Sequence, residues 1–381
     1  MKICIISRNI NNDYTGSFEF DQAKALKNAG CDVYVLSLDL RSIRRKRKLG
    51  IYKETYKGIE ILRCSIPVGA INKNVFHKIG CTIFKKGYLR LKKEAGAFDI
   101  IHSHFLDVSY ICAYTLRSIL KDETTLIVTE HSSKLNDDKK NMEQDTIAKA
   151  EYVYSHADKA ISVSESLAKK IEKNFHVKCE VIYNVFDSDI FKYSAKKQTN
   201  KDKFIFVSTG NLTKNKRMDL LIECFGQAFE EEAVLYIFGE GAEKENLIDL
   251  IKRQGLSEKV FLMGRKSRKE IAEFYRQADA FVLLSEKETF GVAYIEALAM
   301  GLPVIACNSG GPESFVNDKI GVLTDDSKED IIKTLAFIKE NRDEYDGKYI
   351  SDYIGNLCGP EAIAGNIKGI YAEMTKGEVH G

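Results

Sequence analysis

The chain has 381 residues, of which 44% are hydrophobic and 29% charged, and its formal net charge is +2. That composition is typical of a soluble globular protein, and no apolar run approaches the roughly 18 residues that a membrane-spanning helix needs. The length exceeds what one typical hydrophobic core accommodates, so we expect two domains. The first residues, 1–6, lack the apolar core and cleavage site of a signal peptide and are expected to form a strand.

Strand-like and helix-like segments alternate through the first half of the chain, as in parallel sheets with crossover helices. The predicted strands are 2–7, 32–37, 59–63, 99–103, 125–128, 159–163 and 179–183. The predicted helices between them include 19–29, 75–94, 147–156 and 165–175. This pattern predicts a first Rossmann-like domain over residues 1–193.

The second half repeats this alternation after a polar, lysine-rich stretch, 194–203, that has the composition of a linker. Its predicted strands are 204–208, 233–238, 259–263, 280–284, 303–306 and 321–324, and its predicted helices include 218–229, 244–254 and 269–277. These segments predict a second Rossmann-like domain over 204–359, followed by a closing helix at 360–374 that packs back on the first domain. The predicted fold class is therefore α/β, with two parallel-sheet domains facing a central cleft.

The charge is unevenly distributed along the chain. Residues 1–100 contain 20 Lys and Arg against 9 Asp and Glu, whereas the remainder is net negative. The densest basic patch lies between Arg41 and Lys48, and such clusters attract anionic membrane surfaces or nucleic acid. A solvated loop whose charges only aid solubility is the alternative. No nucleic-acid recognition module accompanies the charge, so we expect peripheral membrane contact through this patch and no nucleic acid.

Nine cysteines are scattered through the chain without a CxxC pair, and many have apolar neighbours. An odd number of cysteines in such surroundings is typical of buried, reduced thiols. Their spacing supports no zinc site. We therefore expect a cytoplasmic protein without a metal.

The stretch 285–296 is the most informative, because it places two carboxylates, Glu288 and Glu296, eight positions apart. An apolar strand precedes it, so Glu288 is expected at the carboxyl end of that strand, where α/β sheets bind ligands. Glu296 is expected about two turns into the next helix. The helix N-terminus around Phe290 and Gly291 offers unpaired N–H groups that suit a phosphate. Two hydroxyl-binding carboxylates beside a phosphate cradle indicate a nucleotide-sugar site, and a solvated acidic loop is the alternative.

Two other loops of the second domain carry groups suited to a diphosphate. Lys214, Lys216 and Arg217 lie between the domain's first strand and its next helix, where cations can neutralise a leaving group. A basic surface turn is the alternative, and the position after the first strand favours the phosphate site. The turn from Gly239 to Gly241 lets a ligand approach the backbone, but it lacks the third glycine of a dinucleotide fingerprint.

In the first domain, His131 follows a predicted strand and is expected at the cleft, where it can donate to a sugar hydroxyl. A histidine satisfied by the loop backbone is the alternative. His102 and His104 are assigned a structural role, because no third metal ligand is evident. The amide of Gly16, just before the first helix, is a candidate for contacting a phosphate.

Together these residues resemble those of the retaining glycosyltransferases with the GT-B fold, in the large group often called family four. The pair of Glu288 and Glu296 matches the E-x7-E motif of that family. The other matching stretches follow the family's order along nearly the whole chain: 157–164, Asn184 with Asp187 and Phe191, 238–241, 296–304 and 310–313. The resemblance implies transfer of a sugar from a nucleotide diphosphate donor, with retention at the anomeric carbon and usually without a metal.

The resemblance also implies a role for each matching residue. Glu288 would hold hydroxyls of the donor sugar, Glu296 the ribose hydroxyls, and Lys216 the diphosphate. His131 would lie beside the sugar, and the backbone around Arg265 would meet the base. The predicted catalytic residues are therefore His131, Glu288 and Lys216, and the predicted donor-binding residues are Gly16, Asn211, Lys216, Arg265, Glu288, Phe290, Gly291, Val292 and Glu296.

Three positions depart from the family pattern. Asn211 stands where the family usually has Arg, which removes one phosphate-binding cation, and Lys214 or Arg217 is a candidate replacement. The family's Gly-Gly of the first domain is Gly-Ser here, at Gly16, and its Asn-Gly turn is Asn-Val, at Asn184.

A UDP-sugar is the expected donor, and the basic first domain suggests a glycan or lipid-linked acceptor at the inner membrane face, in cell-surface polysaccharide synthesis. A nucleotide-sugar epimerase is one alternative, but no acid and base pair poised to move a sugar proton stands out. A non-catalytic partner subunit would fit the missing cation at Asn211, but not the two glutamates. A nicotinamide dehydrogenase is excluded because no GxGxxG follows the first strand.

Overall fold

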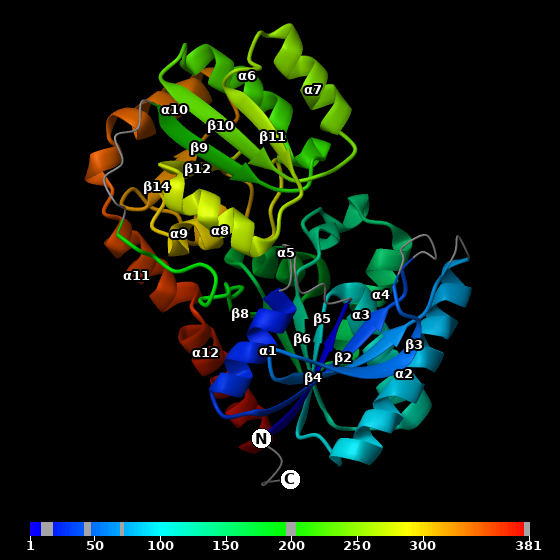
Figure 1. Cartoon of the computed structure of the whole chain (residues 1–381). Helices are drawn as coiled ribbons and strands as arrows, with labels where there is room; N and C mark the ends of the chain where they lie inside the picture. The colour runs from blue at the N-terminus through cyan, green and yellow to red at the C-terminus, as the bar shows by residue number, and fades with distance from the viewer. Residues whose placement is uncertain (9–17, 42–46, 69–71, 196–202, 377–381) are drawn as a thin grey trace. The chain divides into compact units, whose positions relative to one another are not determined.

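The computed structural model describes residues 1–8, 18–41, 47–68, 72–195 and 203–376 (Figure 1). The described residues form two compact units. Unit 1 holds Glu19–Tyr183 together with the N-terminal strand and the residues from Ile363 on, and unit 2 holds Asn184–Ala362. Gly16, residues 42–46 of the basic patch and residues 196–202 of the predicted linker lie outside the described residues, so the expectations attached to them stay predictions.

Unit 1 is built on one eight-stranded sheet. Its strands are β1 (Lys2–Ser7), β2 (Asp32–Asp39), β3 (Gly50–Tyr56), β4 (Ile59–Ser65), β5 (Ile100–His104), β6 (Thr125–Glu130), β7 (Lys159–Ser162) and β8 (Glu180–Val181). Their order across the sheet is β3-β4-β2-β1-β5-β6-β7-β8, and only the β3–β4 pair is antiparallel. Residues 3–6 of β1 are fully buried, as expected for a strand in a sheet that is covered on both faces.

The helices of unit 1 connect these strands. They are α1 (Phe18–Asn28), α2 (Lys73–Ala95), α3 (Leu106–Ala113), which continues directly as the π-helix η1 (Tyr114–Leu120), α4 (Gln144–His156) and α5 (Glu165–Phe175), with short 3-10 turns η2 (Ser133–Leu135) and η3 (Lys139–Asn141). The closing helix α12 (Pro360–Lys376) runs beside α1 in Figure 1, where Lys368 Nζ donates to Ala29 O at 2.6 Å.

Unit 2 is built on a six-stranded, fully parallel sheet. Its strands are β9 (Phe204–Thr209), β10 (Ala233–Phe238), β11 (Val260–Gly264), β12 (Ala280–Leu283), β13 (Val304–Cys307) and β14 (Gly321–Thr324), in the order β11-β10-β9-β12-β13-β14. Its helices are α6 (Met218–Ala228), α7 (Lys244–Arg253), α8 (Arg268–Gln277), α9 (Val292–Ala299), α10 (Lys328–Glu340) and α11 (Gly347–Cys358). Short 3-10 turns are η4 (Lys214–Lys216), η5 (Pro312–Ser314) and η6 (Arg342–Glu344).

The predicted α/β class with two parallel-sheet domains is confirmed. The strand β3 is not predicted, because its alternating charged residues belong to an antiparallel edge hairpin rather than to a buried parallel strand. The expected depth of Glu296 is wrong. The helix α9 begins at Val292, so Glu296 is its fifth residue and lies little more than one turn inside it.

Each sheet has one point at which the strand order reverses. In unit 1 this point lies between β1 and β5, and in unit 2 it lies between β9 and β12. Crossover connections leave such a switch point in opposite directions and open a crevice at the carboxyl ends of the two strands, where α/β proteins bind ligands. The loops that follow these four strands are therefore the first place to look for a functional site.

Candidate active site

Two loops of unit 2 meet at the switch point between β9 and β12. Lys216 lies on the turn η4 after β9, and Glu288 lies on the loop after β12. The two side chains form an ion pair, and each is more than four-fifths buried. The fold thus brings together two predicted site residues that are 72 positions apart in the sequence.

Asn215 joins the same two loops. Its carbonyl oxygen accepts from Glu286 N at 2.8 Å, and its Nδ2 donates to Lys287 O at 3.0 Å. The neighbouring Arg217 has a left-handed φ of +45° and donates from Nε to Leu284 O at 2.7 Å. These bonds fix the spacing of the loops and therefore the position of the ion pair between Lys216 and Glu288.

Asn211, which stands where the family usually has an arginine, is exposed on the loop after β9. Of the two candidate replacements, Arg217 is paired with Asp326, from Nη2 to Oδ1 at 2.7 Å. The side chain of Lys214 is exposed and, within the part of the chain that the structure describes, forms no ion pair. Lys214 is therefore the better candidate for a phosphate-binding cation, and this assignment stays a hypothesis.

The helix α9 begins directly after Gly291, which caps it with a φ of +100° that favours glycine. Gly311 packs tightly against the same turn, since a Cβ there would lie 2.4 Å from Phe290 O. The ring of Phe290 is buried against Phe315, with centroids 5.1 Å apart. Phe290 and Gly291 can therefore offer only backbone groups to a ligand, and Val292 contributes the first N–H of the helix.

Glu296 on α9 is 1% exposed and forms an ion pair with Arg268, from Oε1 to Nη2 at 3.0 Å. Arg268 is also buried, and its Cζ lies 5.3 Å from the ring centroid of Phe191. It is the first residue of α8, whose start is set by a capping box between Ser267 and Glu270. The sequence does not single out Arg268, because the capping signature locates the helix start but not the partner of the side chain.

The loops after β9, β10 and β11 converge at the same sheet edge. Gly239 N donates to Gly264 O at 2.9 Å, and a Cβ on Gly239 would lie 1.8 Å from Gly210 O. Arg265 and Asn211 each directly follow one of these glycines and are exposed. The close backbone contacts therefore place both predicted donor-binding residues beside the turn between Gly239 and Gly241.

In unit 1, three histidines stack at the carboxyl ends of β5 and β6. The ring centroids of His102 and His104 are 4.6 Å apart, and those of His104 and His131 are 5.2 Å apart. His131 Nε2 lies 3.0 Å from His104 Nδ1, and His102 bonds Thr129 and Tyr371 at 2.6 Å each. Burial lowers the pKa of His102 to about 3 and that of His104 well below 6.5. His104 is therefore a neutral partner that orients His131.

The cation of Arg8 lies close to this stack. The Cζ of Arg8 is 3.1 Å from the ring centroid of Phe105, and that ring is 4.7 Å from the ring of His131. Arg8 N donates to Glu19 Oε1 at 3.2 Å, and burial raises the pKa of Glu19 to about 7. Neither Arg8 nor Glu19 is singled out by the sequence analysis, although the position of Arg8 directly after β1 is a signal that could have been used.

Three findings apply to the described residues as a whole. No three His, Cys, Asp or Glu side chains among them are placed to hold a metal ion. All nine cysteines are described, and none forms a disulfide. No helix in the described ranges is both long and apolar enough to cross a bilayer.

Two units, each built on a largely parallel sheet with polar side chains at its switch point, have the architecture of the GT-B fold. Residues 20–190 match the Glycosyltransferase Family 4 domain, and residues 189–351 match the Glycosyl transferases group 1 domain. The chain therefore belongs to the glycosyltransferases that pair these two domains, as predicted, and the retaining mechanism stays a prediction.

Two curated relatives show what this chain is similar to in sequence. The chain is 25% identical over 237 residues to N-acetyl-alpha-D-glucosaminyl L-malate synthase of Bacillus anthracis, covering 59% of this chain and 61% of that protein. It is 31% identical over 196 residues to the N-acetylgalactosamine-N,N'-diacetylbacillosaminyl-diphospho-undecaprenol 4-alpha-N-acetylgalactosaminyltransferase of Campylobacter jejuni, covering 50% of this chain and 53% of that protein. The matches thus span between half and two thirds of each relative's length.

Solved structures share the fold over the whole chain. Sucrose-phosphate synthase from Thermosynechococcus elongatus has a TM-score of 0.83 at 18% identity, and the match covers 99% of this chain and 99% of that chain. The lipopolysaccharide outer core galactosyltransferase WaaB has a TM-score of 0.71 at 15% identity, covering 98% of this chain and 100% of that chain. At these identities the likeness shows the fold alone.

Proposed function

We propose that this protein is a retaining glycosyltransferase that moves a sugar from a nucleotide diphosphate donor, with a UDP-sugar favoured, to a glycan or lipid-linked acceptor in cell-surface polysaccharide synthesis. The observation that carries the proposal is the pair of Lys216 and Glu288 at the β9/β12 switch point, beside the N-terminus of α9. A cation and unpaired amides suit a diphosphate, and a carboxylate suits sugar hydroxyls.

The proposed roles follow from these chemistries. Lys216 and the amides at Gly291 and Val292 would neutralise the departing diphosphate, and Glu288 would hold the sugar. A bound diphosphate would compete with Glu288 for the Lys216 ammonium, so the ion pair would hold both side chains in position before the donor binds. Glu296 would hold the ribose from its fixed pair with Arg268.

The remaining roles concern the base, the acceptor side and the cellular setting. The exposed edge at Arg265 would meet the base, and His131, oriented by His104, would lie beside the sugar. We propose that no metal takes part, because Lys216 and the helix amides can stabilise the leaving group. A lipid-linked acceptor at the cytoplasmic membrane face is favoured by the Campylobacter relative, whose name contains a diphospho-undecaprenol acceptor.

The test is a thermal-shift screen of the full chain over nucleotide sugars, followed by a transfer assay that reports the anomer of the product. A bound donor at 100 times its dissociation constant stabilises the protein by about 2.7 kcal/mol. Lys216→Ala should lower kcat by about 100- to 1,000-fold, the cost of losing one group that stabilises the transition-state charge. Lys252→Ala, an exposed lysine of α7, is the matched control and should be neutral.

Four results would contradict the proposal. An unchanged kcat in Lys216→Ala would contradict the assignment of Lys216 to the diphosphate site. A product with the inverted anomer would contradict the retaining mechanism. A donor that is isomerised without an acceptor would indicate the epimerase. Stabilisation of a partner enzyme without any turnover would indicate the non-catalytic subunit, which is the function that the missing cation at Asn211 favours.

A further inference from the structure

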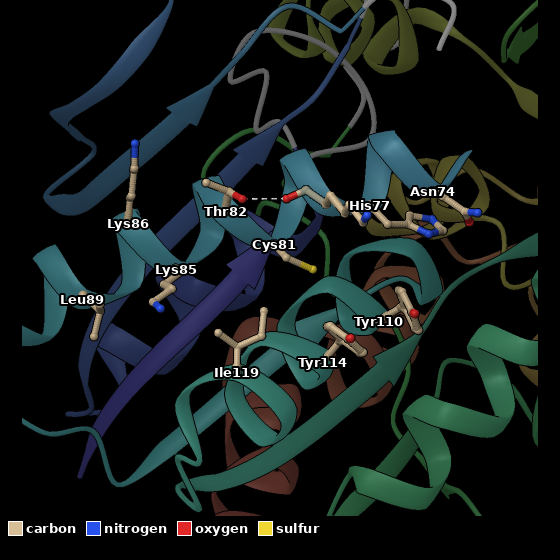
Figure 2. Close-up of a pocket in the computed structure, with 11 residues that line it drawn as sticks. Asn74, His77, Cys81, Thr82, Lys85, Lys86, Leu89, Tyr110, Tyr114 and Ile119 are labelled. Carbon is tan, nitrogen blue, oxygen red and sulfur yellow. Dashed lines mark hydrogen bonds between the residues drawn. The ribbon is translucent and has the colours of Figure 1, made fainter. Parts of the chain in front are cut away.

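A groove with a volume of about 900 Å³ runs along unit 1, outside the site described above. One wall is α2, and the other is formed by the end of α3 and by η1. In Figure 2, Cys81 and Lys85 point from α2 toward Tyr114 and Ile119 on the opposite wall. The groove is therefore a space between two elements of the same unit, with apolar atoms on both sides and lysines on one.

The opposite wall owes its shape to the π-helix η1. A π-helix bonds residue i to residue i+5 and has more residues per turn than an α-helix, so residues five positions apart lie on the same side of it. Tyr114 and Ile119 are five positions apart, and both line the groove. In an α-helix, residues at this spacing would point to different faces. The π-helix thus presents two large side chains to the same space.

The rim of the groove leaves large apolar side chains in water. Leu89 is 44% exposed on α2, and on η1 Ile119 is 41% exposed and Tyr114 is 38% exposed. Leaving apolar surface in water is unfavourable, and grouped exposure of this kind is typical of an interaction surface. His77, Tyr110 and Tyr114 form adjacent ring pairs at one end, with centroids 5.2 and 5.9 Å apart. Side chains with an apolar ring and a polar tip are typical of a membrane–water interface.

The charge on α2 has one sign. Residues 73–93 contain seven Lys and Arg and no Asp or Glu. Away from the groove, Lys92 is paired with Asp122 at 2.7 Å and Arg90 with Glu94 at 3.0 Å. The lysines that line the groove have no such partner in the part of the chain that the structure describes. Among the described residues, no carboxylate forms an ion pair with the three lysines that line it, Lys78, Lys85 and Lys86.

We propose that this groove binds an acyl chain of an anionic phospholipid, with its phosphate on the lysines of α2, and that α2 and η1 dock the protein on an anionic membrane. Charge complementarity selects this occupant, because the unpaired cations require anions and the apolar space between the helices requires a hydrocarbon chain. The inference goes beyond the proposed function, since docking needs no turnover. It also assigns membrane contact to α2 and η1 rather than to the patch between Arg41 and Lys48.

The test is flotation of the full chain with vesicles of phosphatidylcholine, with or without phosphatidylglycerol. The wild type should bind only the anionic vesicles, and binding should fall as NaCl rises. Reversing all three lysines, in the triple variant of Lys78→Glu, Lys85→Glu and Lys86→Glu, should weaken binding by about 100-fold or more, given the contribution of each lysine near such a surface. The matched control reverses three exposed lysines elsewhere in unit 1, with Lys140→Glu, Lys169→Glu and Lys178→Glu.

A second arm asks whether a chain enters the groove. Phosphatidylglycerol with a photoreactive acyl chain should cross-link to peptides from α2 and η1 in the wild-type protein, which avoids any question of variant folding. The double variant of Leu89→Ser and Ile119→Ser should lose the cross-link, whereas Phe337→Ser, at an equally exposed apolar residue of α10, should keep it.

Either of two results would overturn the proposal. Anionic vesicles that bind the triple variant as tightly as the control would show that the groove lysines do not dock the protein. A wild type that ignores vesicles but forms a dimer, which Ile119→Ser abolishes, would assign the groove to a second copy of the chain. Neither result depends on glycosyl transfer, so failure here leaves the proposed function intact, and failure of the transfer assay leaves the docking result intact.

Discussion

The ion pairs of unit 2 show that the fold decides which partner a charged residue has. Lys216, Glu288 and Glu296 stand out in the sequence by residue type and by position after a strand or in a helix. Their partners do not, because Glu288 meets Lys216 through strands that are neighbours only in the sheet order. Arg268, the buried partner of Glu296, is visible in the sequence only as an arginine at a helix start.

Glu130, beside His131, supports a prediction at the same scale. Its Oε1 accepts from His131 N at 2.8 Å and from Ser132 N at 2.7 Å, and burial raises its pKa from 4.5 to about 7. Between pH 4.5 and 7, Glu130 is deprotonated in the unfolded chain but still protonated in the folded one. The free energy of unfolding therefore falls as the pH rises from about 4.5 to 7, and this loss is complete above 7. Glutamine matches the neutral form and avoids that loss.

We therefore expect Glu130→Gln to be more stable than the wild type at pH 8, by up to about 3 kcal/mol, with the difference closing toward pH 4.5. Urea unfolding of both proteins between about pH 4.5 and 8 measures this difference in the free energy of unfolding. Glu172→Gln, at an exposed site on α5, serves as the control. A stability difference that is the same at every pH would show that burial does not hold the Glu130 proton.

At the scale of elements, two glycines differ in whether the packing around them leaves room for a side chain. The loops after β9 and β10 touch at Gly239, whose φ of +151° and 1.8 Å approach of a Cβ to Gly210 O leave no room for a side chain. Gly369 is an exposed residue inside α12, and a Cβ there meets no atom within 4 Å. The same substitution should therefore have opposite effects at the two sites.

Gly369→Ala should stabilise the protein by about 0.5–1 kcal/mol, because alanine loses less conformational freedom than glycine in a helix. Gly239→Ala should destabilise it by at least about 3 kcal/mol, because two backbone segments must separate. Thermal unfolding of both variants beside the wild type measures the two shifts. Destabilisation by Gly369→Ala, or tolerance of Gly239→Ala, would contradict the packing described for that element.

The whole molecule combines two units of different charge. Residues 1–100, which apart from 13–18 belong to unit 1, carry a net charge of +11, whereas the carboxylate motif of Glu288 and Glu296 belongs to unit 2. This division matches the proposed division of labour, with anionic lipid on unit 1 and the nucleotide on unit 2. Each unit has its own sheet and core, so a ligand of one unit can be followed separately from the other.

We expect UDP to slow hydrogen exchange in unit 2, at amides within 209–217 and 286–296. At 100 times its dissociation constant, a ligand slows site-disrupting openings by about 100-fold. Peptides from α2 in unit 1 are the internal control and should exchange as before. Mass spectrometry of the wild type and of Lys216→Ala measures the effect, which the variant should lose. Protection confined to unit 1 would move the nucleotide site away from the β9/β12 switch point.

The sequence by itself determined the fold class and most of the strands, and it singled out Glu288 and Lys216 as candidate site residues, because hydrophobic periodicity and short motifs are local properties of the chain. It did not determine β3, the length of α9 before Glu296, or the π-helix η1, because pairing at a sheet edge and side-chain packing decide these. Only the tertiary structure decided which charges are paired. Burial and strand order join Glu296 to Arg268 and His131 to His104, and they leave the lysines along the groove of α2 without a carboxylate.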